Sequence, residues 1–165
     1  FNLPLLIFLD MPGFMLGSHA EQIATMRRGA RALIASAECQ VPKIEFMVRK
    51  SYGVAADAPN SIGLPNSLNL RFGWPSGEWG GIPIEGGVAA AYRREIEAAE
   101  DPEAHRLAIE ERLLRLRSPF RAAHRGDVID LIDPRETRSL ACRFVNLAQP
   151  KLRELAQRNK RAVRP

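Results

Sequence analysis

The chain opens with an unbroken run of apolar residues that extends from Leu3 to Leu9 and ends at Asp10. Short continuous apolar runs are typical of strands that are covered on both faces, as in parallel sheets. The run is far shorter than the roughly 18 residues that a membrane-spanning helix requires. Pro12 and Gly13 then break the apolar pattern. We therefore expect a core strand followed by a loop.

A change of period after this loop predicts a strand-helix-strand unit. Ser18 and Glu21 have the spacing of a capping box, and the apolar residues that follow recur at helical spacing as far as Ala37. This pattern predicts one helix of about five turns. In residues 41–48 the side chains of Ile44, Phe46 and Val48 alternate with those of Lys43, Glu45 and Met47, which predicts a second strand. The two strands of such a unit are nearly always parallel.

The rest of the chain has the pattern of loops followed by helices. Residues 57–87 are rich in proline, glycine, asparagine and serine, which is typical of binding loops, and contain one expected strand near Leu70 to Trp74. The further elements expected are a helix over Glu85 to Glu100, a helix capped by Asp101 and ending at Ser118, a short helix over Phe120 to His124, a strand and a helix capped by Asp133 that runs toward Leu147, and a last helix from Pro150 to Asn159. The expected fold class is α/β, with residues 1–165 as a single domain.

Composition places the chain among ordinary globular proteins. Hydrophobic residues make up 45% and charged residues 26% of the sequence, which argues against disorder. Cys39 and Cys142 are expected to be reduced thiols, and the expected location is cytoplasmic. The apolar start lacks the features of a signal peptide. Because the chain begins at Phe1 without a methionine, we expect it to be part of a longer protein whose missing segment lies upstream.

Basic charge gathers late in the chain. The net charge is +5, and the excess lies in Arg112 to Arg125 and in Arg153 to Arg164. Such charge suits nucleic acid or an anionic small molecule. We interpret these arginines as the solvated faces of helices, because no aromatic-interleaved RNA signature or helix-turn-helix spacing accompanies them. No nucleic-acid or membrane partner is therefore expected, and a nucleic-acid module is the most distant alternative.

The side chains offer no familiar catalytic motif. His19, His105 and His124 are scattered, and neither cysteine has a partner at metal-ligand spacing, so no metal site is expected. Ser51 has neither a nucleophile elbow nor a neighbouring base. The glycine pairs lack both the lysine of a phosphate-binding loop and the spacing of a dinucleotide fingerprint.

A backbone site is the remaining hypothesis. Gly53, Val54 and Ala55 follow the second strand directly, and small residues there would aim successive N–H groups at one point. Such a turn can hold an oxyanion. The competing interpretation is that Gly53 merely permits a tight turn. The residues alone leave both open.

Four segments, in this order and spacing, together resemble one family. They are LDMPGFMLG with EQIATMRRGA, then VPKI with RKSYG, then GWPSGEWGGIPIEGGVAAAYRREIE, and finally SPFRAAHRGDVIDLIDPRETR. They resemble the C-terminal half of the carboxyltransferase (beta) subunit of biotin-dependent acyl-CoA carboxylases of the acetyl-CoA and propionyl-CoA type. The resemblance spans Leu9 to Arg138.

The resemblance implies a crotonase-like fold of repeated ββα units. It also implies that this half receives carboxybiotin while an N-terminal half, absent from this chain, binds the acyl-CoA. In the family, a biotin nitrogen takes the α-proton, so that no protein side chain acts as the base. The implied partners are a biotin carboxyl carrier protein, a biotin carboxylase subunit and further copies of the chain, as a dimer or a trimer of dimers. The implied activity is carboxyl transfer from carboxybiotin to an acyl-CoA.

Site residues follow from the resemblance position by position. Gly53, Val54 and Ala55 match the family turn whose amides donate to the biotin oxygen, and Asp57 matches a position linked to acyl-chain selection. Three residues of the first loop, Pro12, Gly13 and Phe14, are the biotin-pocket candidates.

Two residues of the turn depart from the family. Val54 stands where the family usually has glycine, and Ala56 stands where it often has tyrosine. Valine would lose conformational freedom if this position required a positive φ. These departures support one alternative, a non-catalytic assembly module of the same fold. A biotin-dependent acyl-CoA decarboxylase is a further alternative, because it shares this half.

Overall fold

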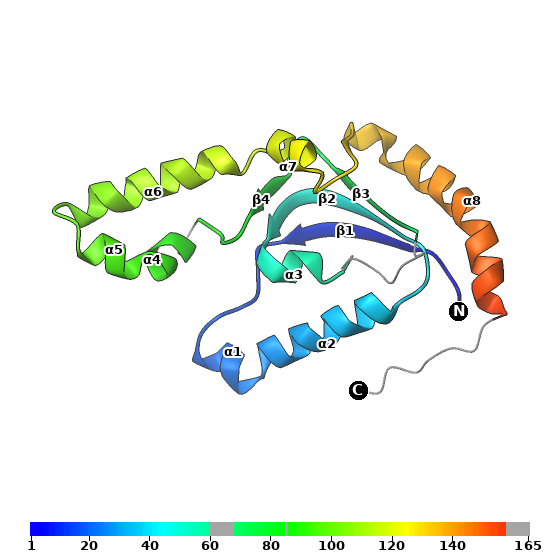
Figure 1. The fold of residues 1–165 in the computed structure, drawn as a ribbon, viewed down its shortest axis with the longest axis horizontal. Coiled ribbons are helices and arrows are strands. Elements are labelled where there is room, and N and C mark those ends of the chain that lie inside the picture. The colour runs from blue at the N-terminus through cyan, green and yellow to red at the C-terminus, as the bar shows by residue number, and fades with distance from the viewer. Residues whose placement is uncertain (60–67, 85, 158–165) are drawn as a thin grey trace.

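The computed structural model describes residues 1–59, 68–84 and 86–157 of the chain. A sheet of parallel strands lies at its centre (Figure 1). The sheet has five strands: β1 (Leu5–Met11), β2 (Lys43–Tyr52), β3 (Asn69–Gly73), β4 (Glu78–Gly80) and β5 (Asp130–Leu131). Its order is β1-β2-β3-β5, and β4 pairs with the end of β2. Every pairing is parallel, which confirms the expected strand-helix-strand unit. The sequence pattern missed β4, which has only three residues.

The first strand is less covered than its apolar run predicted. Leu9 is buried, but the side chains of Leu5, Leu6 and Phe8 are 41%, 42% and 58% exposed. The expectation of cover on both faces was therefore wrong for the described residues. The physical reason is position: within the part of the chain that the structure describes, β1 pairs only with β2 and forms an edge of the sheet.

The second strand is the buried centre of the sheet. Ile44 and Phe46 pack into one apolar cluster with residues of α8, whereas Met47 belongs to a separate cluster on the other face. The alternating residues Lys43 and Glu45, which would face solvent on a one-sided strand, are also completely buried. The ammonium of Lys43 donates to the backbone carbonyl of Ser36 over 2.6 Å, and burial lowers the pKa of this lysine.

The helical segment between β1 and β2 is broken in two. It consists of α1 (Ser18–Gln22) and α2 (Thr25–Glu38), and Ala24 at the break has a φ of 55°. The prediction of one continuous helix was therefore wrong. So was the capping box, because Gly17 occupies the N-cap position and no side chain caps α1.

Three helices form an arm that projects away from the sheet (Figure 1): α4 (Gly87–Ala91), α5 (Arg93–Glu97) and α6 (Pro102–Leu116). The helix expected over Glu85 to Glu100 is interrupted at Tyr92, and residue 85 itself lies outside the described residues. Asp101 caps α6 as expected, accepting from the N–H groups of Glu103 and Ala104 over 3.1 and 3.0 Å. The arm has its own small cluster of buried residues, which comprises Ile84, Val88 and Ile109.

The last helices return to the sheet. The helix α7 (Pro119–Arg125) ends at Gly126, whose φ of 81° suits glycine, and Asp133 caps the short 3-10 helix η1 (Pro134–Glu136). The next helix, α8 (Thr137–Ala156), is continuous and contains Pro150 in its interior. The prediction of two helices separated at Pro150 was wrong, because buried residues on both sides of the proline, Phe144 and Ala148 before it and Leu152 and Leu155 after it, form one continuous apolar face. Asn159 lies outside the described residues.

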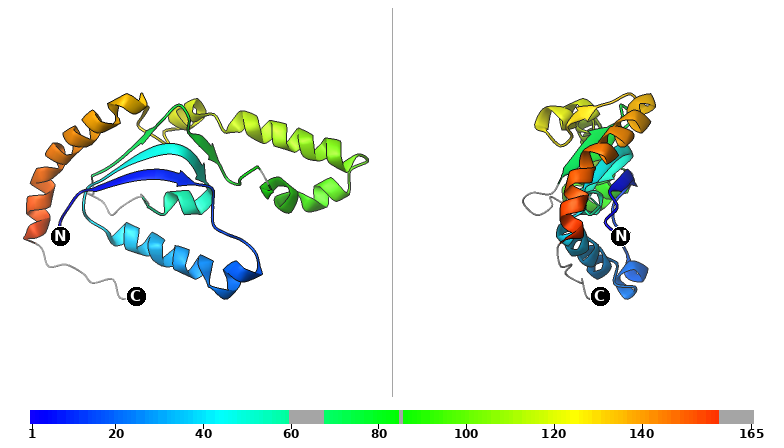
Figure 2. Two further views of the ribbon diagram at one scale, coloured as in Figure 1. Left: turned by 180° about the vertical axis from the view of Figure 1, so that it is seen from behind. Right: turned by 90° about the vertical axis from the view of Figure 1, so that its right-hand side faces the viewer.

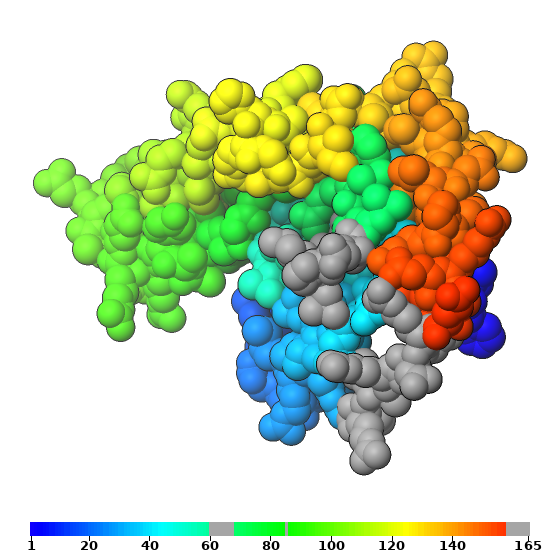
Figure 3. All heavy atoms as spheres, turned by 45° about the vertical axis from the view of Figure 1, so that its right-hand side comes forward, coloured from blue at the N-terminus to red at the C-terminus, as the bar shows by residue number. Residues whose placement is uncertain are grey.

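The view from behind shows α8 and the arm at opposite ends of the sheet (Figure 2). The strands point toward the arm (Figure 1), so that their carboxyl ends meet the arm's base. Figure 3 shows the arm standing out from the body, with a hollow between it and the α1–α2 segment. Within the described residues, no helix has the length and apolar character to cross a bilayer.

The cap of α6 gives a test of the fold. Replacing Asp101 by alanine removes the acceptor for two N–H groups and should lower the free energy of unfolding by about 1 kcal/mol. Asp101→Asn, which keeps a side-chain oxygen, is the matched control and should lose only a small part of this. Chemical denaturation of the three proteins measures the difference. Equal stability of all three would contradict the cap.

Candidate functional site

The central strand runs directly into a turn at its carboxyl end. Helix α3 (Gly53–Asp57) begins immediately after Tyr52, and Gly53 has a φ of 60°, in the left-handed region. A Cβ atom at this position would lie 3.2 Å from the carbonyl oxygen of Gly81. Both the backbone angle and the close approach therefore favour glycine here. Val54 has no positive φ, so that valine is not strained at that position.

The small residues of the turn serve packing as well as access. Ala55 and Ala56 are each 2% exposed, and Ala56 belongs to the cluster that lies against Met47 and Trp79. Larger side chains would hold α3 away from the sheet. Close packing of α3 against the sheet is therefore a second reason for the small residues, besides the tight turn at Gly53.

The N–H groups at the start of α3 are the predicted donors of the anion site. The first N–H groups of a helix have no partner inside it. Within the described backbone, no hydrogen bond joins the N–H of Val54 or Ala55 to a loop, turn or helix cap. Because α3 has only five residues, such a site would depend on these individual donors and not on a helix dipole.

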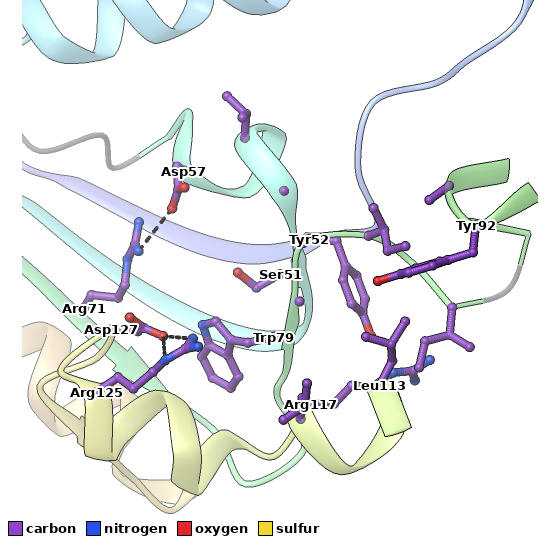
Figure 4. A pocket seen from close by; sticks show the side chains of 18 residues that line it. Ser51, Tyr52, Asp57, Arg71, Trp79, Tyr92, Leu113, Arg117, Arg125 and Asp127 are labelled. Atoms are coloured by element: carbon purple, nitrogen blue, oxygen red, sulfur yellow. Dashed lines mark hydrogen bonds and ion pairs between the residues drawn. The ribbon is translucent and has the colours of Figure 1, made fainter. Parts of the chain in front are cut away.

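Gly53 and Val54 line a pocket of about 930 Å³ between the end of β2 and the base of the arm (Figure 4). Asp57 also lines it, so that the turn and this carboxylate border the same pocket. Ala55 is buried behind them and does not line the pocket. The pocket lies at the carboxyl end of a parallel strand, the edge where ligands of α/β proteins commonly bind.

One wall of the pocket is a clamp around Tyr52. The phenol of Tyr52 donates to Oε2 of Glu78 over 2.9 Å, and the Arg117 guanidinium donates to the same oxygen over 2.9 Å. The guanidinium also lies over the tyrosine ring, 5.8 Å from its centroid, where a cation is attracted to the aromatic face. A Cβ at Gly80 would lie 2.8 Å from the same ring, so glycine is needed there too. These contacts fix the residue that immediately precedes Gly53.

A second wall of the pocket is charged. Arg71 on β3 pairs with the buried carboxylate of Glu45 over 2.8 Å and with Asp57 over 3.5 Å. Arg125 and Asp127 form a further pair that lines the same wall (Figure 4). The pocket therefore has an aromatic side and a charged side.

The carboxyl end of β1 is joined to β2 without lining the pocket. Asp10 accepts from the Arg49 guanidinium over 2.8 Å and from the Lys50 N–H over 3.1 Å, and the arginine holds the pKa of Asp10 below its ordinary value. This joins the ends of β1 and β2.

Three candidates lie apart from the pocket in this structure. Pro12, Gly13 and Phe14 are not among the residues that line it, and the Phe14 ring instead packs closely against Gly29 of α2. Their assignment to a biotin pocket stays a prediction.

Sequence reasoning missed most of the pocket wall. Tyr92 lines the pocket while it packs against the arm cluster. Arg71 and Arg117 line the pocket, but they come from separate parts of the chain and have no motif. The interpretation of the late arginines as solvated was wrong for Arg117, whose side chain is only 11% exposed because it pairs with Glu78. Within residues 1–59, 68–84 and 86–157 there is no group of three or more residues that could hold a metal ion.

The backbone of the turn can be tested through stability. Gly53→Ala places a side chain at a positive φ and should lower the free energy of unfolding by roughly 1–2 kcal/mol. Gly81→Ala is the matched control, because its new Cβ meets open space at an ordinary φ. Its expected change is within about 0.5 kcal/mol. Equal losses in both variants, measured by thermal or chemical unfolding, would contradict the special backbone at residue 53.

Comparison with known proteins reveals a family. The model of the carboxyl transferase domain family matches residues 1–163. The carboxyltransferase subunit of propionyl-CoA carboxylase from Haloferax mediterranei is 41% identical over 140 residues, which cover 84% of this chain and 27% of that protein. The alpha subunit of methylmalonyl-CoA decarboxylase from Propionigenium modestum is 35% identical over 156 residues, covering 94% of this chain and 30% of that protein.

A solved structure shares the fold. The transcarboxylase 12S hexamer, with methylmalonyl-coenzyme A and methylmalonic acid bound, has a TM-score of 0.73 and 34% identity, covering 99% of this chain and 30% of that chain. The chain thus spans between a quarter and a third of the length of these relatives. The expected crotonase-like α/β fold is confirmed by this similarity. The chain belongs to the carboxyl transferase domain family, as its motifs predicted.

Proposed function

We propose that this chain is the biotin-facing half of an acyl-CoA carboxyltransferase. In this proposal it acts with an acyl-CoA-binding half, and the overall reaction moves a carboxyl group from carboxybiotin to an acyl-CoA of the acetyl or propionyl type. The observation that carries the proposal is the glycine-led turn at the end of β2, which lines a pocket in a chain that belongs to the carboxyl transferase family.

The residues of the turn fit biotin. The φ of 60° at Gly53 favours glycine, and Gly53 and Val54 both line the pocket. Bound carboxybiotin supplies the carboxyl group that is transferred. The N–H groups of Gly53 and Val54, which line the pocket, would donate hydrogen bonds to its ring oxygen and favour negative charge there. Ala55, the third residue of the predicted turn, would support them from behind. No side chain of this chain is needed as a base in the proposal.

The Tyr52 clamp would hold these donors in place. Donors that are already oriented lose little free energy when charge develops on a substrate. Tyr52 is 1% exposed and is fixed by Glu78 and Arg117, so the strand end that leads into the turn is firmly held.

The partners and location follow as part of the same proposal. A biotin carboxyl carrier protein and a biotin carboxylase subunit would deliver carboxybiotin in the cytoplasm. A second copy of the subunit would face this pocket within a dimer or a trimer of dimers. The solved transcarboxylase 12S relative is described as a hexamer, which supports an oligomer of this kind.

A biotin-dependent decarboxylase is the second candidate. The methylmalonyl-CoA decarboxylase relative covers 94% of this chain at 35% identity, which favours a shared half-site for both directions of transfer. Assays with carboxybiotin and with a malonyl-type thioester, run side by side on the same enzyme, distinguish the two.

The non-catalytic module is less favoured. Its support was Val54 in place of glycine and Ala56 in place of tyrosine. The positive φ lies at Gly53 and not at Val54, so the valine does not distort the turn. Ala56 is buried in the core and takes part in packing.

A pair of substitutions at residue 54 tests the proposed donors. Val54→Pro removes one N–H group within the first turn of α3, where the fixed φ of proline is tolerated. Proline at residue 53 would be unsuitable, because that position has a φ of 60°. Val54→Pro should lower kcat for carboxyl transfer about 100- to 1000-fold. Val54→Ala keeps the N–H group and should retain most of the activity.

Carboxyl transfer is measured on the subunit complete with its acyl-CoA-binding half, with circular dichroism as the check on folding. A folded Val54→Pro protein with a rate close to that of Val54→Ala would show that the turn is not an oxyanion site. Transfer that is absent from the unchanged, folded and oligomeric enzyme would instead favour the non-catalytic module.

A further inference from the structure

The charged wall of the pocket contains a chain of three groups that begins in the core. Glu45 on β2 and Arg71 on β3 stand opposite each other in the parallel register, and Asp57 closes α3 above them. Figure 4 shows Arg71 reaching from the sheet toward Asp57 across the pocket. Arg71 and Asp57 both line the pocket, whereas Glu45 lies beneath it.

The inner contact fixes the arginine. Glu45 is completely buried, and its Oε2 accepts from Nε of Arg71 over 2.8 Å. A buried carboxylate is costly unless a cation or hydrogen-bond donors compensate it. The guanidinium of Arg71, whose side chain is only 19% exposed, is therefore held in one place by the core.

The outer contact joins the fixed guanidinium of Arg71 to Asp57 at the pocket. Nη1 of Arg71 lies 3.5 Å from Oδ1 of Asp57, at the outer limit of a hydrogen bond. The Asp57 side chain is 64% exposed, so it has room to take several rotamers. Arg71 is the ionic partner that the structure gives it, and the attraction favours the rotamer that points into the charged wall.

The other arginine on this wall does not play this part. Arg125 pairs with Asp127, two residues further along the chain, and its side chain is 61% exposed. That pair is local and has no link to α3. The connection between the core and the turn therefore passes through Arg71.

We propose that Arg71, anchored by buried Glu45, is a positioning residue that orients Asp57 and thereby helps to set which acyl chain the pocket accepts. This inference rests on the proposed function and on the prediction, made from the family resemblance, that Asp57 takes part in acyl-chain selection. It assigns that selection to the Arg71–Asp57 pair and not to Asp57 alone.

A double-mutant cycle tests the pair. The first variant is Asp57→Asn. The second is Glu45→Met with Arg71→Met, which removes both members of the buried pair together and leaves no lone charge in the core. The readout is the ratio of kcat/KM for propionyl-CoA to that for acetyl-CoA, measured on the subunit complete with its acyl-CoA-binding half. An exposed ion pair is weak, so each variant should change the ratio about 2- to 5-fold.

Asp57→Asn and the double methionine variant should shift the kcat/KM ratio in the same direction. The protein that carries all three substitutions should show no larger shift than either variant alone. Arg71→Lys is a further variant that keeps a charge beside Glu45 but shortens the reach toward Asp57. It should shift the ratio as Asp57→Asn does, which also provides the answer if the methionine pair does not fold.

The control is Arg93→Met on α5, which removes an exposed arginine paired with Glu97 and should leave the ratio unchanged. If Asp57→Asn shifts the ratio while neither Arg71 variant does, the positioning role is wrong and the proposed function stands. If the changes at residues 57 and 71 are simply additive, the two residues act separately and the inference also fails. If the unchanged enzyme transfers no carboxyl group, the proposed function falls and this inference falls with it.

Discussion

Burial of β2 on both faces is the constraint on which the rest of the molecule depends. This strand pairs with β1, β3 and β4, and it supplies residues to the apolar clusters on both sides of the sheet. Its carboxyl end is held as firmly as its middle, because Tyr52 is buried and hydrogen-bonded. The turn at Gly53 therefore starts from a fixed point. A chain terminus or an edge strand would not provide one.

The same burial explains the charges in the core. A strand that is covered on both faces has no solvent side, so Lys43 and Glu45 must find partners within the protein. Lys43 finds them in the backbone and hydroxyl of Ser36, and Glu45 finds one in Arg71. The second pairing places a fixed positive charge at the pocket. The same ion pair therefore compensates the buried carboxylate of Glu45 and gives the pocket this positive charge.

Several local features could be predicted from the sequence because neighbouring residues determine them. The cap at Asp101, the glycine that ends α7 and the strand before the Gly53 turn all follow from short-range spacing. The predictions failed where packing overrode local preference. Pro150 stays inside a helix because the apolar face continues beyond it, and Ala24 divides a segment whose period predicted one helix.

The sequence by itself determined the family, the parallel strand-helix-strand unit and the position of the turn, because motifs and periodicity are properties of residues close together in the chain. Only the tertiary structure decided which residues share the pocket. Tyr52, Arg71 and Arg117 belong to different elements, and nothing in their spacing along the chain brings them together. They lie together because β2 and β3 pair in a particular register and because the arm packs against the carboxyl ends of the strands. Burial of apolar surface across the whole domain determines both.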